Sequence, residues 1–191
     1  MLIALFALGG FAVGSFPTGI IVARARGIDL RKVGSGNIGA TNVGRALGKR
    51  WAIFVLVVDA LKGWAPAALA QRWLPPLGVA LVALAAVLGH MFSVFLKGRG
   101  GKGVATSLGA ALALAPLAAL ASAGVYLLLY AAFRISSVGS LVAIASFPLA
   151  LYATGDRERA HYWFAAAIAV LVIARHRDNL RRLRRGEELK S

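Results

Sequence analysis

The stretch VATSLGAALALAPLAALASAGVYLLLYAAF, residues 104–133, runs for 30 residues without a charged side chain and has Pro116 near its middle. As a single helix it would be about 45 Å long, whereas one bilayer crossing takes about 20 residues. A proline in a helix interior removes a hydrogen bond and ends or kinks the helix. The stretch therefore predicts two helices, 104–115 and 117–133, of which the first is short.

The rest of the chain has the same membrane character. Of its 191 residues 59% are hydrophobic, the mean hydropathy is +0.75, and further apolar segments cover 2–23, 51–71, 77–96, 138–154 and 160–174. Such runs are too long and too clean for a soluble core. We expect an all-α integral membrane protein with seven transmembrane helices, forming a single polytopic domain over residues 1–191. The first run reads as a transmembrane helix, since no positive segment precedes it as in a signal peptide.

The distribution of charge predicts the topology. The chain holds 22 Lys and Arg against 7 Asp and Glu, a net charge of +15. In a soluble protein this balance would suggest nucleic acid, but beside such hydropathy it is better explained by membrane orientation. Seven spans place 18 basic residues on one side and three on the other, whereas six divide them 12 and nine. Seven spans, with the N-terminus outside and the C-terminus cytoplasmic, are therefore expected.

Polar, glycine-containing segments lie at the ends of apolar spans, within 24–50, 97–106 and 175–191. With seven spans, all three face the cytoplasm. A bilayer tolerates irregular polar backbone only where protein buries it or where it lines a wet cavity. Glycine amides beside Arg and Lys are typical of phosphate sites. Together the segments predict a site for phosphate ligands at the cytoplasmic surface of the membrane.

The first motif is GSGNIGATNVGR, residues 34–45. It supplies small polar side chains (Ser35, Asn37, Thr41 and Asn42), and Arg45 as a bidentate phosphate donor. The alternative is a tight loop between helices with an N-cap at Thr41 or Asn42.

The second motif, GRGGKGVAT at residues 98–106, comes close to a Walker A loop but departs from it. Gly103 follows Lys102 where Ser or Thr is required, and no strand is expected before the loop. ATP is therefore not expected. Anion binding by the loop amides together with Arg99 and Lys102 is expected. The alternative is a loop that only sets the membrane topology. His90 precedes this motif, near the end of the apolar run 77–96, and could face the same cavity.

The third motif is RHRDN, residues 175–179. His176 and Asn179 share a helical face if the last span continues, and His176 could act as a general base or a hydrogen-bond donor. The arginines that follow predict contact with anionic lipid. Ser140, at the start of the sixth span, either lines the site or caps its helix. Asp59 and Lys62, within the second span, are interpreted as a self-neutralising pair rather than as functional groups.

Taken together, these segments resemble the PlsY family, bacterial membrane glycerol-3-phosphate acyltransferases that use acyl phosphate. Its motifs occur in order as SGNIGATNVGR (35–45), GHMF (89–92) followed by GGKGVAT (100–106), and RHRDN (175–179) running on to GEE (186–188). The resemblance covers essentially the whole chain. One departure is Gly98-Arg99, where the family commonly has Phe-Lys.

The resemblance implies transfer of an acyl group from a long-chain acyl phosphate to the 1-hydroxyl of glycerol 3-phosphate. The products would be lysophosphatidic acid and phosphate, in the first step of phospholipid synthesis at the bacterial cell membrane. It implies that Ser35, Arg45, His176 and Asn179 are the residues most needed for activity, and that the glycines of the second motif bind glycerol 3-phosphate. The full substrate-binding set expected is Gly36, Asn37, Gly39, Thr41, Asn42, His90, Arg99, Gly100, Gly101, Lys102, Gly103, Thr106 and Ser140.

An acyl phosphate has a good leaving group, so direct attack needs no acyl-enzyme, in keeping with a chain that lacks cysteine. The proton acceptor is either His176 or a substrate phosphate oxygen. No cofactor or metal cluster is indicated, and magnesium is neither suggested nor excluded. The expected partners are the two substrates and membrane lipids, without nucleic acid or an obligate protein partner.

The competing class is a transporter or channel for a small organic phosphate. Many transporters contain inverted repeats and bind substrate at the bilayer midplane. Neither feature is evident here, because no such repeat is found and all three motifs fall on one side. A lipid-binding scaffold fits less well, since surface Arg and Lys alone would serve it.

Overall fold

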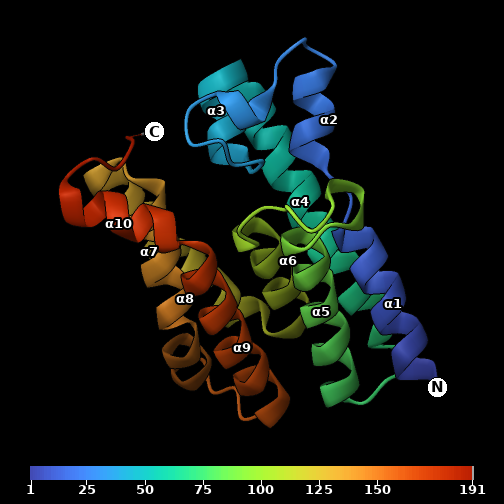
Figure 1. Cartoon of the computed structure of the whole chain (residues 1–191). Coiled ribbons are helices and arrows are strands. Elements are labelled where there is room, and N and C mark those ends of the chain that lie inside the picture. Colours follow the sequence, from blue (N-terminus) through green and yellow to red (C-terminus); the bar gives the residue numbers. More distant parts are fainter. Residues whose placement is uncertain (191) are drawn as a thin grey trace.

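The structure, a computed structural model, describes residues 1–190 and contains helices but no β-strand within that range. Along the chain (Figure 1) these are α1 Leu2–Gly14, α2 Thr18–Arg24, the 3₁₀ turn η1 Leu30–Lys32, α3 Ala40–Leu47, α4 Lys49–Ala70, α5 Pro76–Met91, the 3₁₀ turn η2 Val94–Leu96, α6 Val104–Leu114, α7 Pro116–Phe133, α8 Ser136–Ala153, α9 Arg159–Arg175 and α10 Arg177–Arg185. The all-α prediction is confirmed.

Every predicted apolar segment contains a helix, but the helices differ in length. Five segments are long and apolar enough to cross a membrane: Leu2–Arg24, Lys49–Ala70, Pro76–Leu96, Pro116–Phe133 and Ser136–Ala153. The helices α6, with 11 residues, and α9, with 17, are shorter than these five. The count of seven crossings therefore stays a prediction.

The split at Pro116 is confirmed. Helix α6 ends at Leu114, and Pro116 is the first residue of α7, a position where its missing N–H costs no hydrogen bond. The first predicted segment is a candidate span, Leu2–Arg24, but within it the chain breaks at Ser15–Pro17 between α1 and α2.

Two distant side chains donate hydrogen bonds to carbonyls of this break. The Lys62 ammonium donates to the Phe16 carbonyl at 2.8 Å, and the Ser93 hydroxyl donates to the Ser15 carbonyl at 2.5 Å. Asp59 pairs with Lys62 at 2.8 Å and accepts from the Thr18 hydroxyl at 3.0 Å, where α2 begins. The predicted Asp59–Lys62 pair is confirmed, and it also holds the broken helix in place.

Helices α4 and α6 meet through glycine. A Cβ at Gly63 would lie 2.0 Å from the Thr106 carbonyl oxygen, and one at Gly109 would lie 1.8 Å from that of Ala60. No other residue allows such an approach, and small residues are the usual means of close helix packing in membranes. This contact fixes the short α6 inside the bundle.

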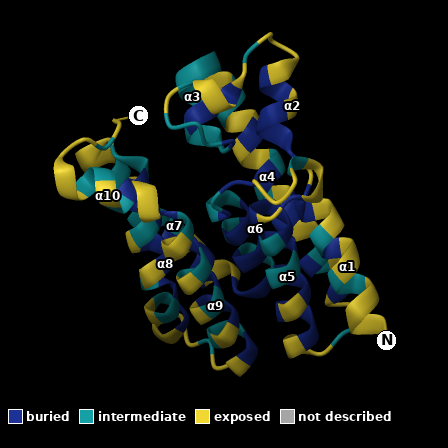
Figure 2. Ribbon diagram, viewed as in Figure 1, coloured by how far each residue is buried: buried dark blue, intermediate teal, exposed yellow. Residues whose placement is uncertain are grey.

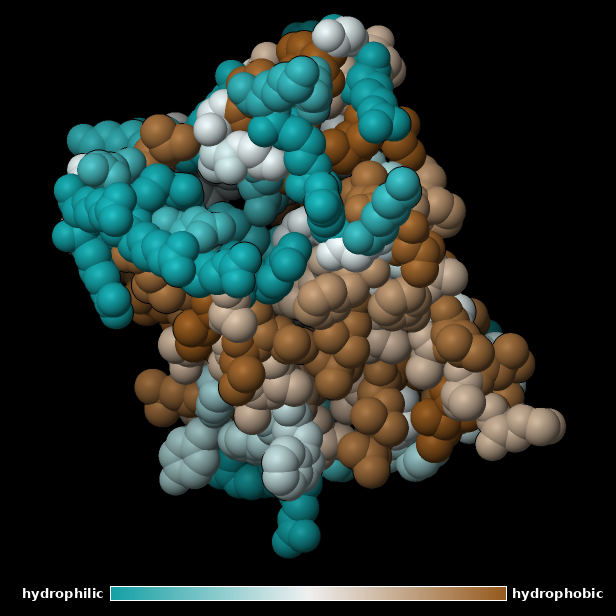
Figure 3. Space-filling view, in the orientation of Figure 1, coloured by the Kyte–Doolittle hydropathy of each residue, from teal (hydrophilic) through white to brown (hydrophobic). Residues whose placement is uncertain are grey.

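The surface divides into a polar end and an apolar band. Figure 3 shows hydrophilic side chains gathered over the end that carries α2, α3 and α10, with hydrophobic side chains across the helices below it. Figure 2 shows many exposed residues along these helices. Large apolar side chains such as Leu128 and Leu149 are exposed. One buried cluster joins α4 to α9 and a smaller one joins α2, η1, α3 and α4. The helices that carry the polar motifs are thus held by two buried hydrophobic clusters.

Candidate active site

The three motif segments line one cavity of about 350 Å³. Ser35 to Arg45 come from the loop before α3 and from α3 itself, Lys102 and Gly103 from the loop before α6, and His176 and Asn179 from the junction of α9 and α10. From this polar end the cavity continues between α6, α7, α8 and α9. Segments more than 130 residues apart in the sequence therefore form one site.

The predicted residues do not all reach the cavity. All four expected catalytic residues line it, and so do Asn37, Gly39, Thr41, Asn42, His90, Lys102, Gly103 and Ser140. The remaining predicted binding residues lie outside its lining: Gly36, Arg99, Gly100, Gly101 and Thr106.

The glycine loop is held by the protein itself. The Gly100 and Gly101 amides donate to the Met91 and His90 carbonyls, each at 3.0 Å. The Arg175 guanidinium in turn donates to the carbonyls of Gly100 at 3.0 Å and Gly101 at 3.1 Å. These two amides are therefore occupied, and the side chain that the loop presents to the cavity is Lys102.

Buried Asn42 organises the loop of the first motif. Its amide nitrogen donates to the carbonyls of Leu30, Val33 and Asn37, and its oxygen accepts from the Ser35 N–H at 2.9 Å. Helix α3 begins at Ala40, so the alternative of an N-cap at Thr41 or Asn42 is wrong. The arrangement holds Ser35 and Asn37 at the cavity wall.

A chain of charged and polar groups crosses the polar end. Lys102 donates to the Asn179 side-chain oxygen, and the Asn179 amide donates to the Glu188 carboxylate. Glu188 also accepts from the Ser137 hydroxyl at 2.9 Å and from the Arg182 guanidinium at 2.7 Å. Arg45 donates to the Leu189 carbonyl at 3.0 Å. The C-terminal tail is thereby tied to all three motifs.

Electrostatics set the charge of these groups. Burial lowers the pKa of Lys102 to about 8, although the Glu188 carboxylate acts in the opposite direction. Burial alone would raise the pKa of Glu188, but hydrogen bonds from Arg182, Asn179 and Ser137 outweigh it and lower that pKa. Near neutral pH the cavity therefore holds an ammonium and a carboxylate. Glu188 is absent from the predicted site residues, and its only signal was the GEE that extends the third motif.

His176 is neutral and has a defined tautomer. Its Nδ1 lies 2.8 Å from the Val172 carbonyl, which can only accept, so Nδ1 carries the hydrogen and Nε2 is the acceptor. Burial, aided by the Lys102 charge, lowers the pKa of His176 to about 4. The last span does not continue unbroken to Asn179, because α9 ends at Arg175 and α10 begins at Arg177.

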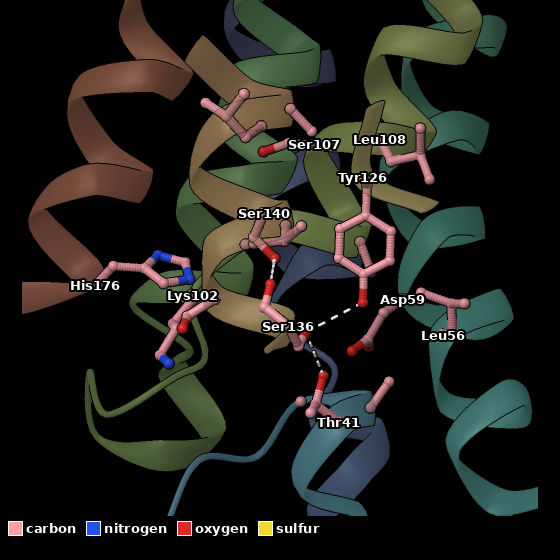
Figure 4. A pocket seen from close by; sticks show the side chains of 18 of the residues that line it. Thr41, Leu56, Asp59, Lys102, Ser107, Leu108, Tyr126, Ser136, Ser140 and His176 are labelled. Atoms are coloured by element: carbon pink, nitrogen blue, oxygen red, sulfur yellow. Dashed lines mark hydrogen bonds between the residues drawn. The ribbon is translucent and has the colours of Figure 1, made fainter. Parts of the chain in front are cut away.

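Three hydroxyls connect α3 to α7 and α8 (Figure 4). The Ser136 hydroxyl lies 3.0 Å from that of Thr41 and 3.1 Å from that of Tyr126, and Ser140 donates to the Ser136 carbonyl at 2.8 Å. Ser136 and Tyr126 also line the cavity and were not predicted. Tyr126 lies inside the predicted span 117–133 and Ser136 just before the span 138–154, and these sequence positions gave no sign that the two side chains meet.

The deeper part of the cavity is an apolar slot. It is lined by Leu108, Ala111, Ala119, Ala123, Leu127, Ala143, Ile144, Phe147 and Ile168. Leu56 of α4 and Leu127 of α7 line the cavity and are also exposed, so the slot reaches the apolar surface of the molecule between these helices. The buried Ser107 and Ser122 hydroxyls beside it have no hydrogen-bond partner within residues 1–190.

Chemically, the arrangement fits an amphiphilic anion, with cations and hydroxyls at one end and room for an alkyl chain at the other. Within residues 1–190, no three His, Asp or Glu side chains gather to hold a metal ion.

Comparisons with known proteins find similarity over nearly the whole chain. The family model described as glycerol-3-phosphate acyltransferase matches residues 4–186. A glycerol-3-phosphate acyltransferase of Anaeromyxobacter sp. (strain Fw109-5) is 50% identical over 94% of this chain and 91% of its own length. One from Geotalea daltonii is 44% identical over 95% of this chain and 93% of its own length.

Solved structures extend the similarity to the fold. The crystal structure of PlsY, an integral membrane glycerol 3-phosphate acyltransferase, in its glycerol 3-phosphate form has a TM-score of 0.95 and 39% identity, covering 100% of this chain and 96% of that one. The lysophosphatidic acid form of PlsY gives 0.93 and 38%, covering 100% and 95%.

Proposed function

The chain belongs to the PlsY family of glycerol-3-phosphate acyltransferases, multi-pass membrane enzymes of phospholipid synthesis, and we propose that its acyl donor is an acyl phosphate. The acyl group goes to the 1-hydroxyl of glycerol 3-phosphate, and the products are lysophosphatidic acid and inorganic phosphate. The similar PlsY structures are of forms with glycerol 3-phosphate and with lysophosphatidic acid, which supports this acceptor and this product.

The observation that carries the proposal is the continuity of the polar end with the apolar slot. An acyl phosphate has a phosphate joined to a hydrocarbon chain, and glycerol 3-phosphate has a second phosphate. The cavity offers Arg45 and Lys102 at one end and a lining of alanine, leucine, isoleucine and phenylalanine at the other. The exposed Leu56 and Leu127 mark where a chain can enter from the bilayer.

We assign the phosphates to the basic end. Arg45 presents a planar fork suited to two phosphate oxygens, and Lys102 adds a positive charge whose attraction for an anion is stronger in a partly buried site than in water. Ser35 donates a hydrogen bond to a phosphate or to the developing oxyanion. The side-chain oxygen of Asn42 holds Ser35 in place by accepting from the Ser35 backbone N–H, and that of Asn179 holds Lys102 by accepting from its ammonium.

In the reaction, the 1-hydroxyl oxygen attacks the carbonyl carbon of the acyl phosphate. The bond from that carbon to the phosphate oxygen breaks, and phosphate leaves with the electron pair. His176 accepts a hydrogen bond from the hydroxyl at Nε2 and orients it. Because the pKa of His176 is about 4, a phosphate oxygen, with a second pKa near 6, is the better final acceptor of the proton. Positioning and charge stabilisation supply the rate.

The proposed topology follows the charge. Residues 1–191 form one domain of seven spans in the bacterial cell membrane, with the N-terminus outside. The segments 24–50, 97–106 and 175–191 face the cytoplasm, where glycerol 3-phosphate is found. The gathering of polar side chains at the end that carries α2, α3 and α10 supports this orientation (Figure 3).

The test uses purified protein in lipid nanodiscs with glycerol 3-phosphate and either palmitoyl phosphate or palmitoyl coenzyme A. We expect lysophosphatidic acid and phosphate in equal amounts from palmitoyl phosphate only. Arg45→Ala and Asn179→Ala should lose this activity, while Arg184→Ala, an exposed arginine of α10, should keep it. Turnover of palmitoyl coenzyme A alone would refute the donor, and accumulation of glycerol 3-phosphate in vesicles without product would favour a transporter.

A further inference from the structure

The apolar slot has a closed end. On each of the four helices around it, the residue lining the cavity furthest from the polar end can be identified: Ala111 of α6, Ala119 of α7, Phe147 of α8 and Ile168 of α9. One helical turn further on, Leu114, Leu151 and the pair Phe164 and Ala165 are buried without lining the cavity. The lining of the slot therefore ends inside the bundle on all four helices, and buried side chains lie beyond it on α6, α8 and α9.

The depth of the slot follows from helix geometry. The residues of α8 that line it are Ser136, Ser137, Ser140, Ala143, Ile144 and Phe147, which is one continuous face. Phe147 follows Ser136 by 11 residues, about 16 Å along a helix that rises 1.5 Å per residue. The slot thus extends from the polar hydroxyls of Ser136 and Ser140 deep into the apolar part of the molecule.

Phe147 is the large side chain at this end. It is 2% exposed and packs in the same cluster as Ala119, Leu151 and Ile168. Two of its three counterparts on the neighbouring helices are alanines, so the aromatic ring of Phe147 and the side chain of Ile168 supply most of the bulk that closes the slot. A bound chain that extends from the polar end into the slot would meet them after passing Ile144.

We propose that Phe147, with Ile168, forms the end wall that limits the length of the acyl chain this enzyme accepts. The inference rests on the proposed function, because it assigns the acyl chain of the donor to the slot. Protein interiors are close-packed, so an acyl chain cannot extend past these side chains without displacing them. A chain that is too short leaves apolar wall uncovered, and a chain that is too long must bend or leave the slot.

Two substitutions with opposite effects test the end wall. Phe147→Ala deepens the slot. For acyl phosphates longer than the wild-type optimum, kcat/KM should therefore rise relative to kcat/KM for shorter ones. We expect a change of about tenfold for each methylene that the wild-type slot does not accommodate. Ala119→Leu fills the slot from the facing helix and should shift the optimum toward shorter chains. Leu149→Ala is the control, since Leu149 lies two residues from Phe147 and is 67% exposed.

The measurement is kcat/KM for each saturated acyl phosphate from decanoyl to eicosanoyl, with the full-length protein in nanodiscs. Opposite shifts in the two variants, with the wild-type profile in Leu149→Ala, would support the end wall. An unchanged profile in active Phe147→Ala or Ala119→Leu, or an equal loss at all chain lengths, would overturn it. If Phe147→Ala fails to fold, Ala119→Leu decides alone. Wild-type protein inactive with every acyl phosphate would instead refute the proposed function, and the wall with it.

Discussion

Lys102 is the cavity group whose charge should make activity depend on pH. Burial lowers its pKa to about 8, so the ammonium is present below that value and lost above it. If Lys102 binds a phosphate, kcat/KM for glycerol 3-phosphate should fall as pH rises through about 8, toward a loss of tenfold or so per pH unit for one essential proton. The measurement is kcat/KM against pH at constant ionic strength.

Lys102→Arg provides the control for this limb of the profile. An arginine stays charged across the range, so the alkaline fall should disappear even if the maximum is lower. His176, with a pKa of about 4, should add no inflection near the ordinary histidine value of about 6.5. An alkaline limb that persists in Lys102→Arg would assign the ionisation to another group.

Glu188 should matter for stability more than its neighbour. Its carboxylate accepts from Ser137, Asn179 and Arg182, whereas Glu187 is exposed. Glu188→Gln puts an amide N–H against one of these donors and should cost about 1–3 kcal/mol. Glu187→Gln should stay within about 0.5 kcal/mol. Thermal unfolding in one detergent at pH 7 compares the two.

The pH dependence of stability gives a second check on Glu188. Its folded pKa is lowered, so its contribution is present above the unfolded value and lost as pH falls through the folded one. Glu188→Gln should therefore unfold at a temperature that approaches the wild-type value in acid. A constant difference between the two proteins at all pH values would mean that the carboxylate charge plays no part.

At the scale of helices, the contact between α4 and α6 should tolerate no side chain at Gly109. A Cβ there would lie 1.8 Å from the Ala60 carbonyl oxygen, so Gly109→Ala must push the two helices apart. Because Lys102 and Gly103 lie in the loop immediately before α6, activity should fall together with stability. Gly124→Ala, in α7, is the control, since a Cβ at Gly124 would meet nothing within 4 Å. Equal melting temperatures for the two variants would contradict the packing.

The sequence predicted helix ends where a local rule applies. Pro116 ends α6 by its own chemistry, so the split of residues 104–133 could be foreseen. The break at Ser15–Pro17 could not, because it is completed by Lys62 and Ser93, which are 46 and 78 residues from the carbonyls they cap. Helix breaks that depend on distant donors give no signal in the local hydropathy.

The candidate site shows the same division. Residue types pointed to Ser35, Arg45, Lys102, His176 and Asn179, and all five line the cavity. The glycine amides were expected to face an anion, but those of Gly100 and Gly101 bond to the turn at the end of α5. Whether a backbone N–H is free depends on which carbonyl lies nearest in the folded chain. The sequence identifies the groups available but not how each is used.

At the scale of the whole molecule, the division into a basic end and an apolar band matches the shape of the proposed substrates. The cavity crosses that division, with Arg45 and Lys102 on the polar side and Phe147 on the apolar side. An acyl phosphate at a membrane surface has the same orientation, with its phosphate in water and its chain in the bilayer. The protein can therefore bind it without turning it out of the membrane.

The proposed orientation of the chain in the membrane can be tested by cysteine labelling, because the chain has no cysteine of its own. Single cysteines replace exposed, uncharged Ala25 and Thr154 and exposed Glu187, which lie respectively after α2, after α8 and in the C-terminal tail. Seven spans with the N-terminus outside place only Thr154→Cys outside, where an impermeant maleimide should label it in intact cells. Ala25→Cys and Glu187→Cys should react only after permeabilisation. With six spans and the N-terminus outside, position 154 would be inside and position 187 outside. With six spans and the N-terminus inside, position 25 would be outside. Each alternative therefore gives its own pattern of labelling.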